Sequence, residues 1–250
     1  GDASGRIVVW DPRTWTIKRS IAGHPSGVQA MAFSRDGRRL ATGGADGAVK
    51  VWDLSDGELV VQYRGHTDSI KSLDFSADDR RLCSVDTIGA VNCWDLSDSN
   101  SAPFWSESES EHSRITHSAD GVWLAANGDQ LRLWNLREGG KPKVFEEGGH
   151  CVAFSHDSRL LAWGDNRGHI RVWDVKNEEI IHDFAPSTPV GALAFSPNGD
   201  HLVGGMGVPF LRSRARQCPL WVFDLKSGEK LPSLPHHRGH VAAIRFSRDG

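Results

Sequence analysis

Two residue pairs recur along the chain with one common spacing. The first is tryptophan followed by aspartate, or a close variant, at Trp10-Asp11, Trp52-Asp53, Trp94-Asp95, Trp134-Asn135, Trp173-Asp174 and Phe223-Asp224. The second is an aromatic residue or histidine followed by serine, at Phe33, Phe75, His117, Phe154, Phe195 and Phe246. The first three members of each set are 42 residues apart. Such a period indicates a repeat architecture, in which each unit buries its apolar surface against its neighbours.

Each repeat is predicted to form four short strands. In the first full repeat, apolar residues 30–33 precede a tight turn, and strands are expected at 39–43, 48–52 and 59–63. Residues 48–52 alternate with period two, and Gly37, Gly47 and Gly57 stand in the intervening turns. One such sheet cannot cover both of its faces, so sheets stacked around an axis are predicted.

Composition excludes several classes of protein. The chain has 250 residues, 29 basic and 32 acidic, which gives a net charge of −3 and argues against a dedicated nucleic-acid binder. It lacks the ~20 consecutive apolar residues of a membrane helix, and no signal peptide is visible, so a cytoplasmic location is expected. The cysteines, which are expected to be reduced thiols because they form no CxxC pair, are Cys83, Cys93, Cys151 and Cys218.

The repeated motifs resemble the WD-repeat (WD40) β-propeller family. Gly23-His24, the turn 33–37, residues 40–47 and the end of the third strand at 51–53 carry the resemblance, and residues 33–44 resemble bacterial members most. The resemblance covers nearly the whole chain. It implies an all-β propeller of four-stranded antiparallel blades.

The strand count predicts one domain, residues 1–250, that is most of a seven-bladed ring truncated at both ends. A partial blade is expected at 1–24 and another at 237–250. The five full blades are expected at about 25–65, 66–107, 108–147, 148–186 and 187–236.

The resemblance also implies a buried structural tetrad in each blade. In the first repeat it comprises His24, Thr42, Asp46 and Trp52. The second repeat keeps His66, Ser84 and Trp94 but has Ile88 at the aspartate position, and later repeats depart further, at Ser108, Ala126 and Arg167. Only the first tetrad is therefore expected to be complete. The same side chains could form a hydrolytic triad, but their recurrence at the repeat period favours the structural role.

Two loops are candidate partner-binding segments. A nine-residue excess within 206–219 carries Arg212, Arg214 and Arg216, which either are solvated or bind an acidic segment or a phosphate. The loop before the third repeat carries Glu107, Glu109 and Glu111, which either keep the loop soluble or accompany a basic partner or phosphorylated serines. Trp105 beside it could anchor a partner, although the surplus tryptophans are expected to serve packing: Trp15, Trp105, Trp123, Trp163 and Trp221.

A histidine cluster raises the question of a metal. His236, His237 and His240 could bind Zn²⁺, but His237 fits a tetrad position and His240 belongs to a Gly-His pair. Neither a metal nor a cofactor is expected.

The predicted function is a non-catalytic, monomeric scaffold that mediates protein–protein interactions through loops on one face of the propeller. It is expected to bind no nucleic acid and to have no membrane segment. One alternative is a regulatory or targeting domain of a larger enzyme, such as a bacterial serine/threonine protein kinase. The second alternative is a propeller hydrolase, for which the sequence offers no converging set of ligands.

Overall fold

The computed structural model describes residues 1–97, 103, 105–107, 112–165, 167–186, 188–207, 218–237 and 239–247. All regular elements in these residues are strands, which form one two-stranded sheet and five four-stranded antiparallel sheets. The contacts divide the chain into two compact units, Gly1–Ile115 and Thr116–Gly250.

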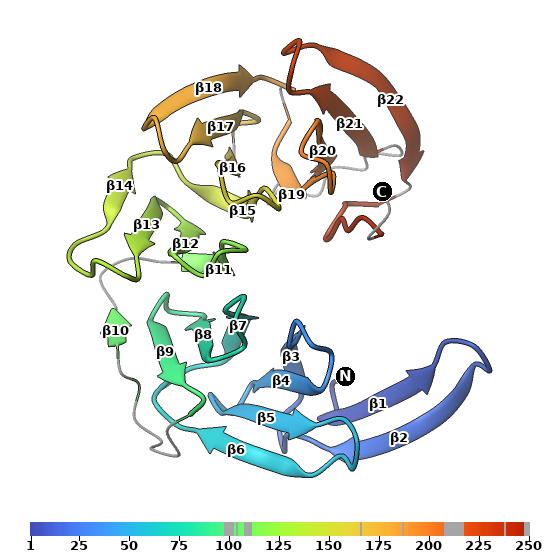
Figure 1. Cartoon of the computed structure of the whole chain (residues 1–250). Coiled ribbons are helices and arrows are strands. Elements are labelled where there is room, and N and C mark those ends of the chain that lie inside the picture. Colours follow the sequence, from blue (N-terminus) through green and yellow to red (C-terminus); the bar gives the residue numbers. More distant parts are fainter. Residues whose placement is uncertain are drawn as a thin grey trace. The chain divides into compact units, whose positions relative to one another are not determined.

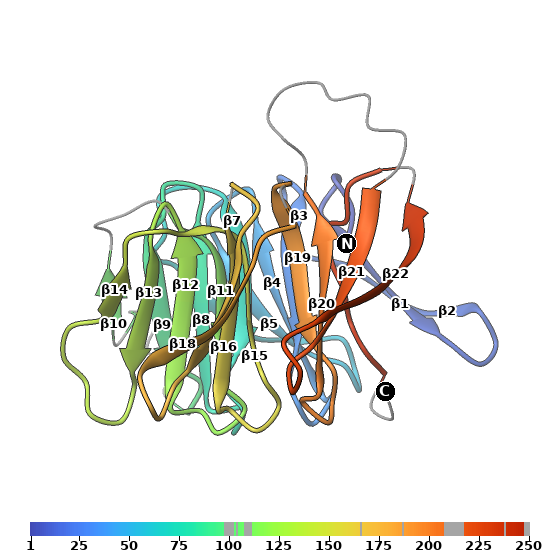
Figure 2. The same ribbon diagram turned by 90° about the horizontal axis from the view of Figure 1, so that it is seen from above.

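The first unit holds a hairpin and two four-stranded sheets (Figure 1). The hairpin pairs β1 (Arg6–Asp11) with β2 (Thr16–Ala22), and Figure 2 shows it extending away from β3. The first sheet has the order β3 (Val28–Phe33), β4 (Arg39–Gly44), β5 (Val49–Asp53) and β6 (Leu59–Tyr63). The second has the order β7 (Ile70–Phe75), β8 (Arg81–Asp86), β9 (Val91–Asp95) and β10 (Trp105–Glu107).

The second unit holds the other sheets, and the boundary between the units falls within β11 (His112–His117). Strand β11 precedes β12 (Trp123–Gly128), β13 (Leu131–Asn135) and β14 (Lys143–Phe145) in the third sheet. The fourth sheet has β15 (Gly149–Phe154), β16 (Leu160–Asp165), β17 (Ile170–Asp174) and β18 (Glu179–Phe184). The fifth has β19 (Val190–Phe195), β20 (His201–Met206), β21 (Cys218–Asp224) and β22 (Lys230–His237).

Within each unit, the first strand of one sheet packs against the sheet before it: β7 packs on β3 and β4, β15 on β12, and β19 on β15 and β16. In the first unit, Ile70 and Phe75 of β7 join Val49 and Val51 of β5 in one apolar cluster. Gly43 permits this close approach, because a Cβ at that position would overlap the side chain of Ile70. The second unit repeats the relation between Gly164 and Val190, and between Gly205 and Val241. The glycines before the third strand are therefore explained by packing between sheets.

The turn between the first and second strands is closed by its serine. Ser34 Oγ donates to Asp36 Oδ1 at 2.6 Å and accepts from the backbone N of Arg39 at 2.9 Å. Ser76 and Ser155 make the same pair of bonds in later sheets. The recurring aromatic-serine motif therefore marks a self-contained turn whose polar groups are satisfied locally.

The fourth residue of that turn lies in the left-handed region of φ. It is glycine in three sheets but Asp79 (φ 55°) and Ser158 (φ 63°) in the others. The Asp79 carboxylate accepts from the backbone N of Arg35 at 2.7 Å and of Asp36 at 3.0 Å. Ser158 Oγ accepts from the backbone N of Asp120 at 3.0 Å. Where a side chain replaces glycine, it therefore bonds to the same turn of the preceding sheet.

Residues 239–247 do not form the strand that was expected to open a further blade. The backbone N of Val241 donates to Met206 O at 2.8 Å, and Val241 is buried. In the described part of the chain, no strand pairs with residues 242–247. A single extended segment without a partner gains no ladder of hydrogen bonds, which accounts for its irregular conformation.

Candidate functional site

The first tetrad is a continuous chain of hydrogen bonds between two strands and two loops. Trp52 Nε1 on β5 donates to Thr42 Oγ1 on β4 at 2.9 Å, and Thr42 Oγ1 lies 2.9 Å from His24 Nε2. His24 Nδ1 lies 3.0 Å from Asp46 Oδ1 in the turn after β4. A carboxylate oxygen accepts, so Nδ1 carries the proton and Nε2 accepts from the threonine hydroxyl. Every polar atom along this path is therefore satisfied.

The second tetrad has a carboxylate, contrary to the expectation based on Ile88. Asp86, the last residue of β8, places Oδ2 2.9 Å from His66 Nδ1, and His66 Nε2 lies 2.5 Å from Ser84 Oγ. Asp86 and His66 have fully buried side chains. The expectation that Ile88 leaves the second tetrad without its carboxylate was therefore wrong.

Gly44 explains how the carboxylate can come from either of two positions. Gly44 stands 42 residues before Asp86, and a Cβ on Gly44 would overlap the Asp46 carboxylate and the His24 ring. The two aspartates therefore reach the same place beside the histidine from positions two residues apart. In the second sheet this releases Ile88 from the tetrad, and 55% of its surface is exposed.

Both tetrad histidines are held neutral. Burial lowers the pKa of His24 below its usual 6.5, and the neighbouring Asp46 offsets this only in part. Burial also lowers the pKa of His66, against the opposing effect of Asp86. The hydroxyl residues Thr42 and Ser84 have no exposed surface. A nucleophile without exposure cannot meet a substrate, so this geometry does not support the hydrolytic-triad interpretation.

In the third sheet, the residue after the hydroxyl position binds the next sheet. Ala126 occupies the hydroxyl position, as the sequence indicates, and Asn127 follows it. Asn127 Nδ2 donates to Cys151 O at 2.8 Å, and Asn127 Oδ1 accepts from the backbone N of Gly149 at 3.0 Å. The amide therefore binds β15 of the following sheet through two main-chain bonds.

The fourth sheet replaces the tetrad with an ionic cluster. Arg171, 13% exposed at its side chain, lies 3.3 Å from Asp165, 3.6 Å from Asp183 and in contact with Glu147. Trp163, at the hydroxyl position, donates Nε1 to Glu147 O at 2.9 Å. Asp165 takes the strand-end position of Asp86, whereas the side chain of Arg167, which was predicted at the aspartate position, is 80% exposed.

The candidate partner-binding residues lie largely outside the described part of the chain. Those outside it are Arg212, Arg214, Arg216, Glu109 and Glu111. Trp105 and Glu107 belong to β10, where they pair with Cys93 and Val91. Their binding roles stay predictions.

Trp15 does not pack, contrary to what was expected of the surplus tryptophans. It stands in the β1–β2 turn with 78% of its surface exposed and φ 56°. The equivalent turn residues are Gly57, Gly139, Glu178 and Gly228. The turn requires a left-handed residue at this position, and that residue has no core to reach.

The histidine cluster considered in the sequence includes His236, whose side chain lies outside the described part of the structure. Among the described residues, no group of three or more histidine, cysteine, aspartate or glutamate side chains is placed to hold an ion. His237 ends β22 and His240 follows it, and both are exposed.

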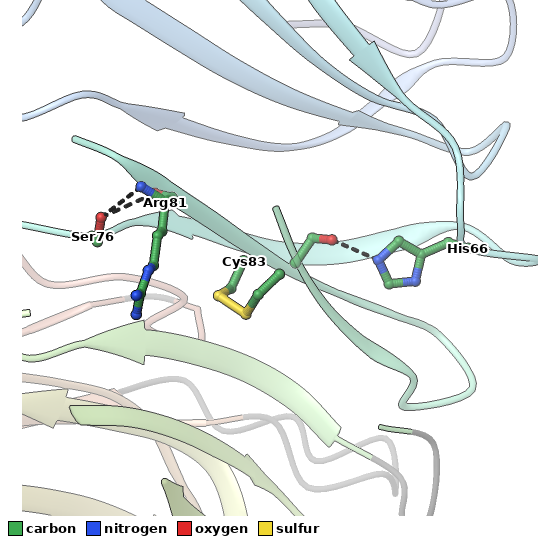
Figure 3. Close-up of a disulfide and its surroundings, with 6 residues drawn as sticks. His66, Ser76, Arg81 and Cys83 are labelled. Atoms are coloured by element: carbon green, nitrogen blue, oxygen red, sulfur yellow. Dashed lines mark hydrogen bonds between the residues drawn. A yellow bond between two sulfur atoms is a disulfide. The ribbon is translucent and has the colours of Figure 1, made fainter. Parts of the chain in front are cut away.

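Two of the cysteines form a disulfide, although all four were expected to be reduced. Cys83 on β8 and Cys93 on β9 are directly opposite in the ladder, with Cα atoms 4.1 Å apart. Figure 3 shows the bridge between the Ser76 turn and His66. Cys151 and Cys218 are buried thiols that do not take part in the bridge. The error arose because spacing along the chain does not show which residues a hairpin brings face to face.

Four-stranded antiparallel sheets that recur at this period, two of them fastened by a histidine–hydroxyl pair, define a WD40-type β-propeller. The family model of the first β-propeller of IFT122 matches residues 1–207, and the chain belongs to this family.

The fold and the repeats are shared with eukaryotic proteins. The chain is 46% identical to human apoptotic protease-activating factor 1 over 66 residues, which are 23% of this chain and 5% of that protein. It is 29% identical to the target of rapamycin complex subunit LST8 of Saccharomyces cerevisiae over 102 residues, 38% of this chain and 34% of that one. A chain in the crystal structure of the mitotic checkpoint complex matches with a TM-score of 0.83 and 21% identity, over 98% of this chain and 76% of that one.

These matches limit which properties of the relatives can be inferred for this chain. The chain spans about a third or less of the length of these two curated relatives, by the shares of 5% and 34%. The relatives named here are eukaryotic and give the resemblance to bacterial arrays no support. Within the described residues, no helix has the length and apolar character needed to cross a membrane.

Proposed function

We propose that this propeller is a non-catalytic scaffold that binds protein partners through the turns and loops at the edge of the blades where His24 and His66 lie. The names of two similar proteins describe assemblies, a target of rapamycin complex and a mitotic checkpoint complex. The buried, neutral state of the tetrads also supports a structural rather than a chemical role for their reactive side chains.

The observation that best supports the proposal is that Ile88 is exposed on a turn whose conformation is fixed by hydrogen bonds. Asp86 Oδ1 accepts from the backbone N of Ile88 at 3.2 Å and of Ala90 at 2.9 Å, and Thr87 N donates to Ser69 O at 2.9 Å. The turn is therefore fixed by the tetrad carboxylate and by the neighbouring loop. An exposed isoleucine on a fixed turn is pre-organised for an apolar cavity of a partner, because little conformational freedom is lost on binding.

The test is Ile88→Asp in the full chain, with Val60→Asp as the matched control. Val60 lies on β6 and is also 55% exposed, so the two changes add the same charge at equally exposed positions. Quantitative affinity purification from the source cells should show partners lost by Ile88→Asp and kept by Val60→Asp. Identical partner sets for both variants and the parent would refute a binding role for this turn.

A further inference from the structure

The disulfide lies beside the second tetrad, whose hydrogen bonds differ from those of the first. Cys83 and Cys93 occupy the register positions that Ala41 and Val51 occupy in the first sheet. Ser84 follows Cys83, and Trp94 follows Cys93. Any displacement of the backbone at the bridge is therefore passed directly to the serine and the tryptophan of the tetrad.

The tryptophan of the second tetrad lacks the bond made by its counterpart. Trp52 Nε1 donates to Thr42 Oγ1 at 2.9 Å, but Trp94 Nε1 has no hydrogen-bond partner among the described residues, although Trp94 is fully buried. Asn92 Nδ2, on the other side of Cys93, also has none there. A buried donor without an acceptor is costly, so two such donors flanking one residue call for a local cause.

The bridge is the local feature that the first sheet lacks, since the pair Ala41–Val51 stands in its place there. It holds the Cα atoms of Cys83 and Cys93 4.1 Å apart, whereas closely paired residues on antiparallel strands are usually about 4.5 Å apart. Ser84 Oγ lies 2.5 Å from His66 Nε2, so the serine keeps its contact with the histidine, whereas Trp94 Nε1 makes no bond to a described residue. Stacking of Tyr63 on Trp94, with centroids 5.1 Å apart, keeps the indole within the core.

We propose that the Cys83–Cys93 disulfide and the Trp94–Ser84 hydrogen bond are alternatives, which makes this blade a redox-sensitive element. In the oxidised blade the bridge joins β8 to β9 and the tetrad lacks its tryptophan bond. In the reduced blade β9 relaxes, and Trp94 Nε1 donates to Ser84 Oγ as Trp52 does to Thr42.

The chemistry is thiol–disulfide exchange with a low-molecular-weight thiol. Two thiol molecules reduce the bridge: the S–S bond breaks, Cys83 and Cys93 each gain a proton, and the two reagent sulfurs join in a disulfide. The reverse step uses the corresponding small-molecule disulfide as the oxidant. Because both cysteines are fully buried, exchange requires local opening of β8 and β9, and its rate should rise at urea concentrations too low to unfold the protein.

The test compares the full chain after equilibration with reduced glutathione and with glutathione disulfide. Mass spectrometry of the blocked protein gives the state of the two cysteines, and ¹⁵N-indole NMR reports Trp94, assigned by its loss in Trp94→Phe. Reduction should move the Trp94 Nε1–H resonance downfield and slow its exchange with solvent, while the Trp52 resonance stays in place. A Trp94 resonance that is unchanged, or free thiols after incubation with glutathione disulfide, would overturn the proposal.

A second set of variants separates the bridge from the oxidant. The double variant Cys83→Ala, Cys93→Val installs the residue pair of the first sheet, and its Trp94 resonance should match the reduced protein under both conditions. Trp94→Phe should lower the unfolding midpoint more in reduced than in oxidised protein, because only the reduced form has the bond to lose. Equal losses in the two states would overturn the proposal.

Discussion

Asp86 reaches His66 from a strand position two residues earlier than the turn residue that serves His24. Their contact is 2.9 Å long and fully enclosed. What the tetrad requires is therefore a carboxylate group beside the histidine, and either of two positions in the repeat can supply it.

Replacing Asp86 with alanine should destabilise the fold. His66 would lose its acceptor in a buried place, and the turn would lose the bonds to Ile88 N and Ala90 N. We expect a loss of about 2 to 3 kcal/mol in the free energy of unfolding. Urea denaturation measures it, and Ile88→Asp, which removes no tetrad bond, should stay within about 0.5 kcal/mol of the parent. Similar losses for the two variants would show that Asp86 is not the tetrad carboxylate.

The stability of the chain should fall on mild acidification. Burial lowers the pKa of both His24 and His66 below the usual 6.5, so the unfolded chain binds more protons than the folded chain just below pH 6.5. Their contribution is therefore complete above pH 6.5 and is lost as the pH falls from there through the folded pKa values. The check is the urea midpoint between pH 7.5 and 5. The double variant His24→Gln, His66→Gln should show a shallower dependence, and a midpoint that rises on acidification would contradict the argument.

The Asp79 clamp should stabilise the pair of sheets that it joins. Asp79→Ala removes two bonds to the backbone of the preceding turn and leaves an alanine at φ 55°. We expect a loss of about 1 to 2 kcal/mol, and a smaller loss for Asp79→Gly, because glycine tolerates this conformation. Chemical denaturation compares the two. If Asp79→Ala, which keeps a side chain at this φ, is as stable as the parent, the two bonds contribute nothing.

Trp15→Gly should stabilise the protein. The residue is 78% exposed, so little buried surface is lost, and glycine removes the cost of a bulky side chain at φ 56°. A gain of about 0.5 to 1 kcal/mol is expected after the greater freedom of the unfolded glycine chain is subtracted. Trp15→Ala keeps the steric cost and serves as the control in thermal unfolding. A lower melting temperature for Trp15→Gly would mean that the indole makes contacts that its exposure does not suggest.

Local patterns predicted the strands well. Expected strands at 39–43, 48–52 and 59–63 are observed at Arg39–Gly44, Val49–Asp53 and Leu59–Tyr63. Alternation and turn residues act over a few positions, so the sequence displays them directly.

The site was harder to predict because its members meet through space. The repeat spacing indicated position 88, which holds Ile88, while the carboxylate comes from Asp86, two residues earlier. The Cys83–Cys93 bridge depends on the register of a hairpin, which the spacing of ten residues leaves open. Asn127 and Arg171 make contacts that have no counterpart in the repeat motif. Comparison with the motif could therefore show that these repeats differ from it, but not which contacts they make instead.

The clamp between Asp79 and the preceding turn joins a side chain to main-chain donors. Any residue except proline offers the same N–H at position 35. Substitutions at position 35 therefore leave its backbone hydrogen bond to Asp79 intact. Fewer residue types suit position 79, since this bond needs a side-chain acceptor on a residue with a left-handed backbone conformation. Two faces of one interface can therefore diverge at different rates, with one blade free to vary its side chains while its neighbour holds the geometry.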